Sequence, residues 1–474
     1  MPRLEDLLDY PLLAAIANRR SRRVARGTSV FSRGMSYESP NLPSPLSPLE
    51  EAILIVSTGL TGITTHDGPL DSTTHGRELG TPFLNILARS GSSPDNSQPT
   101  HFVMVNDEGT WLIKRLKPEQ GLILMKGLPT SWNDWQEDDW MAAASAVKHR
   151  LKPERLDFPR AFPYYLGWNK QLSNVRGTTM FLPLVDTTRM YINALLNICS
   201  EPAGQRPIFL DEWQPFRPRN AMDWIGWLAA KLHLAPAIPY QPIGGVRRAR
   251  GGFVNPGIPI PLGMVRTFLS DHESFFLTQN LMLLAQAMGL GAWVHVTTPS
   301  AYLFDGQGGK VGAGLGFRMQ KPERSWRRWP PLPSNQPNPV GIDGILEGLC
   351  PPYVTIDEAV DQILEQKYGS AGAYGDTTTF NRPYQQARDG KTYLAEGERY
   401  TTEAIAYTRE VCHYIYDTYG RFPAHVDAFY QPGTWLQICH LEMEYYEQFF
   451  DRQLYQQQAN HERVWHTGAV EKGR

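Results

Sequence analysis

The chain has 474 residues, of which 41% are hydrophobic and 20% are charged, and its formal net charge is -2. Its length predicts one large domain plus an extension, with a well-buried core. The lack of a basic excess argues against a general nucleic-acid binder or a membrane-surface protein. The four cysteines, Cys199, Cys350, Cys412 and Cys439, are scattered without a CxxC pair. We therefore expect reduced thiols in a cytoplasmic protein.

The first 60 residues predict two helices. Residues 4–18 carry leucine and isoleucine at roughly helical spacing, and the predicted helix runs into the basic cluster 19–23. After a loop rich in proline and serine, Ser47, Pro48 and Glu50 have the pattern of an N-cap, a first-turn proline and a capping-box glutamate. The apolar residues that follow predict that this second helix is buried.

A β-hairpin is predicted in the second hundred residues. The apolar runs 102–105 and 111–116 flank Asn-Asp-Glu-Gly, a short connection that contains glycine. Residues 61–90, before the hairpin, are expected to form a long inserted loop with one weak helix. Residues 117–250, after it, mix short helices, loops and strand-like pieces whose order the sequence does not define.

A long apolar helix is expected near residue 280. Ser270 and Glu273 have the spacing of a capping box and predict its start, and Gly289 and Gly291 predict its end after about Met288. The helix is apolar on nearly every face, so it should be central or lie at a subunit interface. Its polar interruptions argue against a membrane span.

The last third of the chain is predicted to be a separate helical part. A strand is expected at 293–297, and the composition of 328–341, rich in proline, indicates a linker. Residues 342–474 are predicted to be a mainly helical C-terminal extension.

Three segments have the chemistry of a binding site. Arg19, Ser21 and Arg23 place two guanidinium groups and a hydroxyl on alternate residues, and an extended backbone would let them converge on one phosphate. The polar loop 92–99 would suit a ligand with a mixed donor and acceptor edge, such as the pyrimidine end of a flavin. The glycines after the long helix would allow a flat ring to approach the backbone.

Each segment also has a simpler interpretation. The basic cluster could be an exposed turn, the polar loop a hairpin entrance and the glycines plain C-caps.

Taken in order, these segments resemble the nitroreductase-like FMN-dependent oxidoreductase family. They are ANRRSRRVARG, SSPDNSQPTHFVMV and QNLMLLAQAMGLGAW. The resemblance implies an α+β fold with a central, mostly antiparallel sheet flanked by helices. The flavin domain would occupy 1–327, with insertions at 61–90 and 117–250. The resemblance covers about half of the chain, since the insertions and the C-terminal extension are longer than is usual for the family.

The resemblance also implies roles for individual residues. Arg19 and Ser21 would hold the FMN phosphate, and Arg23 would reach the ribityl chain or the ring edge. Because family members build the site from two subunits, a homodimer would bring the loop 92–98 to the flavin across its interface. The implied cofactor-binding residues are Arg19, Ser21, Arg23, Ser92, Ser93, Asn96, Gln98, Val296, Thr297, Lys321 and Arg324.

The implied reaction is hydride transfer from NAD(P)H through FMN to an electron-poor organic acceptor. The flavin ring carries the chemistry, so no catalytic side chain is predicted. Two alternatives remain open: a flavin-dependent oxidase or dehydrogenase of a biosynthetic pathway, and a non-catalytic relative that acts as a binding module.

The histidines of the last 130 residues are expected to be structural. His440 and Glu444 have the i, i+4 spacing of a metal-ligand pair, and His413, His425 and Asp427 lie nearby in sequence. Their neighbours are aromatic and apolar, and their spacing matches no metal motif. The sequence therefore predicts no metal site.

Overall fold

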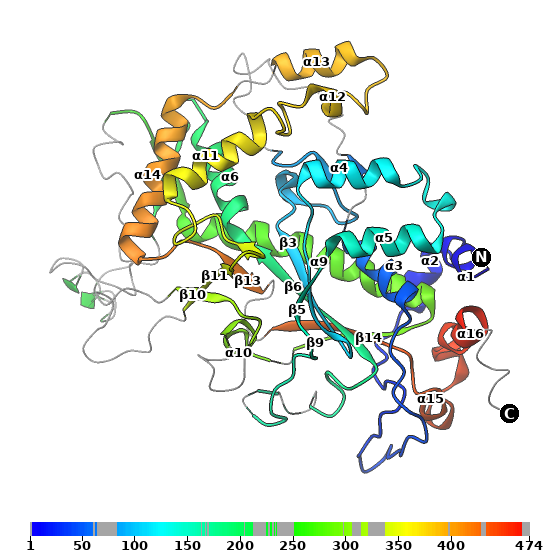
Figure 1. The fold of residues 1–474 in the computed structure, drawn as a ribbon. Helices are drawn as coiled ribbons and strands as arrows, with labels where there is room; N and C mark the ends of the chain where they lie inside the picture. Colours follow the sequence, from blue (N-terminus) through cyan, green and yellow to red (C-terminus); the bar gives the residue numbers. More distant parts are fainter. Residues whose placement is uncertain are drawn as a thin grey trace.

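A computed structural model gives the fold of the chain (Figure 1). It describes residues 2–59, 62–63, 83–162, 164–165, 167, 170–202, 204–211, 224–225, 228–229, 232, 234, 251–296, 298–305, 314–320, 337–396, 399–427 and 433–466. Most of the predicted loop 61–90 and most of the second half of 117–250 therefore lie outside the described residues.

A seven-stranded sheet forms the centre of the molecule, in the order β5-β4-β3-β6-β14-β9, with β13 also paired to β6. Every pairing in this sheet is antiparallel. The structure thus confirms a mixed fold with a mostly antiparallel central sheet. The strands are β3 (Thr100–Asn106), β4 (Gly109–Ile113), β5 (Lys148–Lys152), β6 (Thr178–Asp186), β9 (Gly291–Val296), β13 (His425–Asp427) and β14 (Thr434–Cys439).

The predicted hairpin is confirmed as β3 and β4. Phe102 pairs with Ile113, and Asn106 pairs with Gly109 at the turn. The side-chain Oδ1 of Asn106 accepts hydrogen bonds from the backbone N–H groups of Glu108 and Gly109, at 3.0 and 3.1 Å. An asparagine that closes the turn through its own side chain explains why the short Asn-Asp-Glu-Gly connection is stable.

The division into a flavin domain and a C-terminal extension does not correspond to a structural boundary. β14 lies between β6 and β9, and it pairs with both over Leu436–Cys439. β6, the strand that β14 joins, comes from 117–250, which was predicted as an insertion. The predicted domain bounds and insertions stay predictions, whereas pairing between strands this far apart in sequence leaves no local signal.

Helices cover one face of the sheet (Figure 1). They are α3 (Pro48–Thr58), α5 (Glu137–Val147) and the long α9 (Leu262–Met288). α3 begins with the predicted capping box, in which the Ser47 side chain accepts from the Glu50 N–H and the Glu50 side chain accepts from the Ser47 N–H. Phe102, Met104, Phe181, Leu436 and Ile438 of the sheet pack with these helices in one buried cluster.

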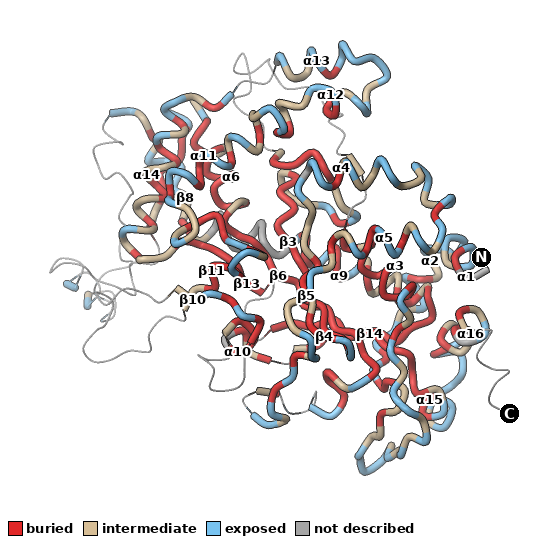
Figure 2. The backbone as a smooth tube through the Cα atoms, in the orientation of Figure 1, coloured by how far each residue is buried: buried red, intermediate tan, exposed pale blue. Residues whose placement is uncertain are grey.

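The alternate residues of the same strands form a second core on the opposite face. Val103, Val105, Met180 and Leu182 pack there against α10 (Ser300–Asp305) and irregular segments. The period of two along each strand therefore sends both sets of side chains into apolar surroundings. Figure 2 shows the resulting buried strands at the centre of the chain.

A helical lobe lies beside the end of the sheet. It consists mainly of α6 (Thr187–Cys199), α11 (Ile356–Tyr368) and α14 (Thr402–Tyr419), which share one apolar core (Figure 1). Buried residues from all three helices, such as Leu195, Ile363 and Tyr407, meet in this core. The lobe joins a helix from the middle of the chain to helices from the last third.

Two helix boundaries differ from prediction. The N-terminal helix is two helices, α1 (Pro2–Leu8) and α2 (Leu12–Asn18), because Pro11 caps the second in an extended conformation. α9 begins at Leu262, well before the predicted start. Glu273 does not cap the helix; it forms a buried ion pair with Arg89. The predicted end is confirmed, with Gly289 in the left-handed region at φ 80°.

The remaining elements lie around these layers. The predicted linker 328–341 is partly described, and its last residues begin β11, which pairs with β10 and β12. The elements are β1 (Gly62–Ile63), β2 (Leu87–Ala88), β7 (Pro207–Leu210), β8 (Asn255–Pro261), β10 (Arg318–Gln320), β11 (Asn338–Ile342), β12 (Leu346–Glu347), α4 (Pro118–Gly127), α12 (Thr377–Phe380), α13 (Ala387–Glu396), α15 (Met443–Phe449) and α16 (Gln456–Trp465). None of the helices within the described ranges is both long and apolar enough to cross a bilayer.

The ion pair between Arg89 and Glu273 should contribute strongly to stability. The side chain of Arg89 is 5% exposed and that of Glu273 is 0% exposed. Removing one partner of a buried ion pair leaves an uncompensated charge. We predict that Arg89→Ala lowers the free energy of unfolding by about 3–5 kcal/mol, as measured by urea denaturation. Arg388→Ala, which removes an exposed pair with Asp389, is the control and should change it by less than about 1 kcal/mol.

Lys367 in α11 should make stability depend on pH. Burial lowers the pKa of Lys367 from 10.5 to about 7, although Asp95 opposes the shift. Between these values the unfolded chain binds more protons than the folded chain, so stability should rise with pH. We predict that the free energy of unfolding rises from pH 7 to pH 10 in the wild type relative to Lys367→Met, by at most about 1.4 kcal/mol per pH unit. Equal pH profiles for the two proteins would contradict this assignment.

Candidate metal centre

The predicted phosphate-binding residues follow α2 on an extended segment. The backbone N–H of Arg22 donates to the carbonyl of Ala292, beside β9. Ser21 and Arg23 are exposed, and the Arg23 guanidinium lies 5.7 Å from the centre of the Trp293 ring. Arg22 and Arg23 therefore border the start of β9, and no anion-binding geometry for Arg19, Ser21 and Arg23 follows from these contacts.

The predicted flavin loop is held by its own side chains. Asn96 Nδ2 donates to the carbonyl of Asn85 at 2.5 Å, and Gln98 Nε2 donates to Asn96 Oδ1 at 2.6 Å. Gln98 Oε1 accepts from Arg89 Nε at 2.7 Å, and Ser93 Oγ accepts from the Gln98 N–H. Asn96 and Gln98 are also buried, so in this chain their amide groups stabilise the loop.

The loop and the basic cluster lie near different parts of α9. Gly91, next to exposed Ser92, contacts Leu277, whereas Arg22 contacts Ala292 beyond the helix end. From Leu277 to Met288 the helix extends roughly 17 Å at 1.5 Å per residue. Among the described residues of one chain these segments contact α9 at positions far apart, so a shared flavin site would need the second subunit that the resemblance implies.

The other predicted flavin-binding residues give no further information on the flavin site. Val296 pairs with Thr434 at the end of β9. Thr297, Lys321 and Arg324 lie outside the described residues.

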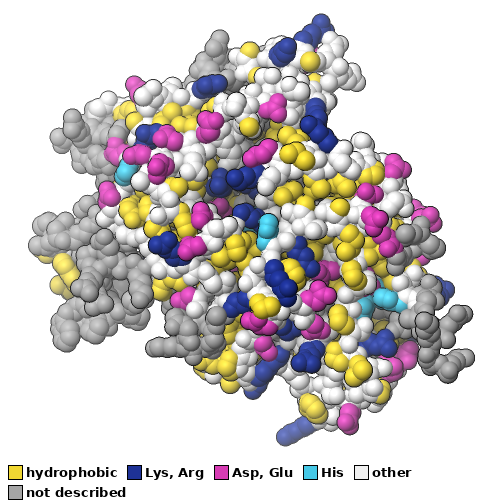
Figure 3. Space-filling model, in the orientation of Figure 1, with side chains coloured by type: hydrophobic (Ala, Val, Ile, Leu, Met, Phe, Trp, Pro, Cys, Tyr) yellow, Lys and Arg dark blue, Asp and Glu magenta, His cyan; other side chains and the backbone are white. Residues whose placement is uncertain are grey.

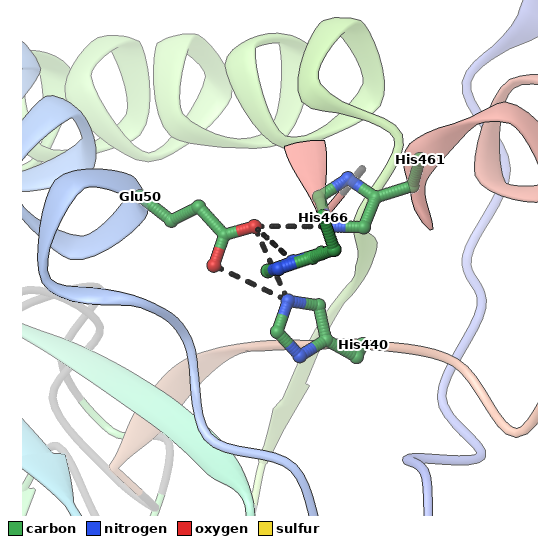
Figure 4. Close-up of side chains that lie close together, drawn as sticks. All are labelled: Glu50, His440, His461 and His466. Carbon is green, nitrogen blue, oxygen red and sulfur yellow. Dashed lines mark hydrogen bonds and ion pairs between the residues drawn. The ribbon is translucent and has the colours of Figure 1, made fainter. Parts of the chain in front are cut away.

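The structure instead brings four metal-ligating side chains together: Glu50, His440, His461 and His466 (Figure 4). Their ligand atoms all lie within 4.8 Å of one another. Glu50 comes from the first turn of α3, and His440 follows β14. His461 lies in α16, and His466 directly follows that helix. Residues separated by nearly the whole chain thus meet at one point.

Three imidazole nitrogens surround the Glu50 carboxylate. Glu50 Oε1 lies 3.2 Å from His440 Nε2, 2.9 Å from His461 Nε2 and 3.4 Å from His466 Nε2. The second oxygen, Oε2, accepts from the Ser47 N–H at 2.6 Å in the capping box. The side chains of Glu50, His440 and His461 are almost fully buried, whereas that of His466 is 31% exposed.

Backbone carbonyls determine the tautomers of two of these histidines. His440 Nδ1 lies 3.1 Å from the Ser44 carbonyl, and His461 Nδ1 lies 2.6 Å from the Met288 carbonyl. A carbonyl only accepts hydrogen bonds, so each contact favours a proton on Nδ1. His440 Nδ1 also lies 3.2 Å from the Ser44 hydroxyl, which can accept from it. In a neutral ring, Nε2 then presents a lone pair. Two lone pairs would therefore face a carboxylate oxygen, which is repulsive unless the rings are protonated or a cation lies between them.

The surroundings of the Glu50 carboxylate favour its ionised form. Burial acts to raise the pKa of Glu50, but His440, His461 and His466 lower it, and the net direction is strongly downward. An ionised carboxylate within a buried group of imidazoles is a suitable ligand set for a divalent cation.

Gly289 allows α16 to approach this position. An added Cβ at Gly289 would lie 2.8 Å from the Gln457 carbonyl and 3.1 Å from the His461 Cβ, and the residue has φ 80°. Any side chain there would push α16 away. The carbonyl of Met288, at the end of α9, is one of the helix-end carbonyls that lack a partner within the helix, and His461 supplies a donor to it.

The other predicted histidines lie elsewhere. Glu444 is not the partner of His440; it accepts from Asn41 Nδ2. His413 is exposed and contacts Asp357 at 3.2 Å. His425 and Asp427 are buried in β13, which pairs with β6. These residues therefore lie apart from one another in the part of the chain that the structure describes, and the sequence interpretation missed the partners of His440.

The missed ligands had weak signals in the sequence. The capping box explained Glu50 fully, and His461 and His466 occur as a plain pair five positions apart. No spacing rule connects position 50 with position 461.

Comparisons with protein-family models, curated proteins and solved structures find no match to this chain. The functional argument therefore depends on the geometry of the chain itself.

Proposed function

We propose that Glu50, His440, His461 and His466 bind a divalent transition-metal ion such as Zn²⁺, and that this metal centre is structural. The observation that carries the proposal is the pair of histidines whose Nδ1–H groups donate to backbone carbonyls while their Nε2 atoms face the Glu50 carboxylate. Histidine ligands of metals characteristically donate their second ring N–H to a carbonyl or carboxylate in this way.

The distances from the Glu50 carboxylate to the three histidines suit tetrahedral coordination. In a tetrahedral zinc site with bonds of about 2.0–2.1 Å, neighbouring ligand atoms are about 3.3 Å apart. The distances from Glu50 Oε1 to the three Nε2 atoms are 2.9, 3.2 and 3.4 Å. Imidazole nitrogens and one carboxylate oxygen suit Zn²⁺ and neighbouring transition metals better than Ca²⁺ or Mg²⁺, which prefer oxygen ligands.

A structural role follows from the number and burial of the ligands. Four protein ligands complete a tetrahedral shell and leave no position for substrate. The ligands come from α3, from the end of β14 and from α16, so a bound metal would join the first helix layer to the C-terminal helix. Metal binding would then add to the stability of the folded chain.

We predict that the purified chain binds one equivalent of Zn²⁺ after treatment with EDTA, measured by calorimetry and by metal analysis after dialysis. His440→Ala and His461→Ala should each weaken binding at least about tenfold because each removes one of four ligands. Zn²⁺ at about 100 times its Kd should raise the free energy of unfolding by about 2.7 kcal/mol.

His413→Ala is the matched control, since it removes an exposed histidine outside the centre. It should bind Zn²⁺ like the wild type. Co²⁺ is a spectroscopic probe of the same centre, and tetrahedral coordination should give visible absorption bands that His461→Ala lacks. Equal Zn²⁺ affinity in His461→Ala and His413→Ala would contradict the metal centre.

The flavin prediction is our second proposal, because α9 ends at Gly289 and leads into β9 beside Arg23 as the resemblance implies. On this proposal a homodimer binds FMN and transfers electrons from NAD(P)H to an electron-poor organic acceptor. The internal hydrogen bonds of Asn96 and Gln98 make it the weaker of the two.

We predict on this second proposal that chain loaded with FMN is yellow and bleaches when NADH or NADPH is added. Arg19→Ala combined with Arg23→Ala should abolish FMN retention, because both guanidinium groups would be lost from the phosphate site. A spectrum recorded after FMN incubation and gel filtration measures both effects. A colourless wild-type chain would exclude the flavin proposal without affecting the metal proposal.

A further inference from the structure

A cavity with a volume of about 390 Å³ lies where the ends of β3, β4 and β6 meet α11. Its lining includes His101 at the start of β3, Lys114 and Arg115 just beyond β4, and Arg189 in the first turn of α6. Figure 3 shows basic side chains gathered in a hollow near the middle of the face shown. The size is within the range of small-molecule sites.

The lining holds four cationic side chains, those of Lys114, Arg115, Lys117 and Arg189. The first three have no acidic partner within 4.0 Å among the described residues. Only Arg189 forms an ion pair, with Asp186 at 3.4 Å. Lys114 donates through Nζ to the carbonyl of Ile345. Arg115 Nε is buried and makes no hydrogen bond to any residue described in the structure. Burying a guanidinium nitrogen without a hydrogen-bond acceptor costs free energy. A ligand oxygen in the cavity would supply the acceptor that Arg115 Nε lacks within the described residues.

The acidic residues of the lining do not neutralise these cations. Asp186 is buried, but it already accepts from the Thr188 N–H and pairs with Arg189. Glu119, Glu347 and Glu365 are exposed at the rim, where water screens their charge. Burial, followed by Arg189 and Arg89, lowers the pKa of Arg115, although Glu273 and Asp186 oppose the shift.

His101 adds a neutral donor to the same lining. Its Nδ1 accepts from the backbone N–H of Arg115 at 3.2 Å. Burial, followed by the neighbouring charges Arg115, His425, Arg89 and Lys114, lowers the pKa of His101 well below its usual value. The ring is therefore neutral near pH 7, and Nε2 carries its proton.

We propose that this cavity binds a small organic molecule through a phosphate or carboxylate group held by Arg115 and Lys114. Guanidinium and ammonium groups bind oxyanions through charge-assisted hydrogen bonds. The amide of Gln362 in the lining can contact an uncharged polar part of the same molecule, whereas the Gln366 amide is held by Arg189 and Asn85.

This anion site is separate from the proposed metal centre. Asp186 lies at one end of β6, and Thr178 at the other end pairs with Cys439, next to His440. β6 has nine residues, so the two sites are about 25 Å apart at roughly 3.3 Å per residue. The anion site therefore does not depend on the metal proposal.

The test is calorimetric titration of the EDTA-treated full chain with inorganic phosphate and, separately, with malonate. EDTA treatment removes metal that could bind either anion. We expect at least one anion to bind with a Kd near about 1 mM or lower, and binding to weaken as NaCl rises from about 50 to 500 mM. Tighter binding of phosphate would identify a phosphate ester as the ligand class, and tighter binding of malonate would identify a carboxylate.

Arg115→Gln and Lys114→Gln should each weaken binding of the preferred anion at least about tenfold. Lys391→Gln, an exposed residue of α13 outside the cavity, is the control and should bind like the wild type. Circular dichroism checks folding, and Lys114→Gln serves as the test if Arg115→Gln does not fold. Absence of binding by both anions, or equal affinity in the Lys114→Gln and Lys391→Gln variants, would overturn the proposal.

Discussion

The pairing of β14 with both β6 and β9 is the constraint on which the rest of the structure depends. It inserts a strand from the last third of the chain into the centre of the sheet. Its cost is the entropy of closing very long loops, and it is offset by burial on both faces of the strand. Because His440 directly follows β14, the same pairing places this histidine beside the first turn of α3.

Buried charge is compensated differently at three places in the fold. Glu273 has a cationic partner in Arg89. Lys367 donates through Nζ to the hydroxyl of Tyr400 at 2.6 Å, and burial lowers the pKa of its ammonium group, although Asp95 opposes the shift. Glu50 lies among three histidines, two of which present lone pairs when neutral. The first arrangement is complete within the chain, whereas the third would be completed by the cation that we propose, which is why we assign function there.

Local features were predictable where a few neighbouring residues determine the backbone. The capping box at Ser47 and Glu50, the hairpin closed by Asn106 and the glycine end of α9 all appear in the structure. Each depends on side-chain or steric effects within about five residues. The start of α9 was mispredicted because Glu273 satisfies a distant arginine, and a capping pattern cannot reveal that competition.

The sequence by itself determined the local elements, the balance of charge and the types of side chain available for binding. Only the tertiary structure decided which of those side chains meet. Glu50, His440 and His461 are brought together by strand pairing and by the close approach of α16 to Gly289. Arg115 and Arg189 likewise meet because β4 and β6 end on the same side of one sheet. Such contacts depend on the packing of the whole chain, and a short stretch of sequence does not determine that packing.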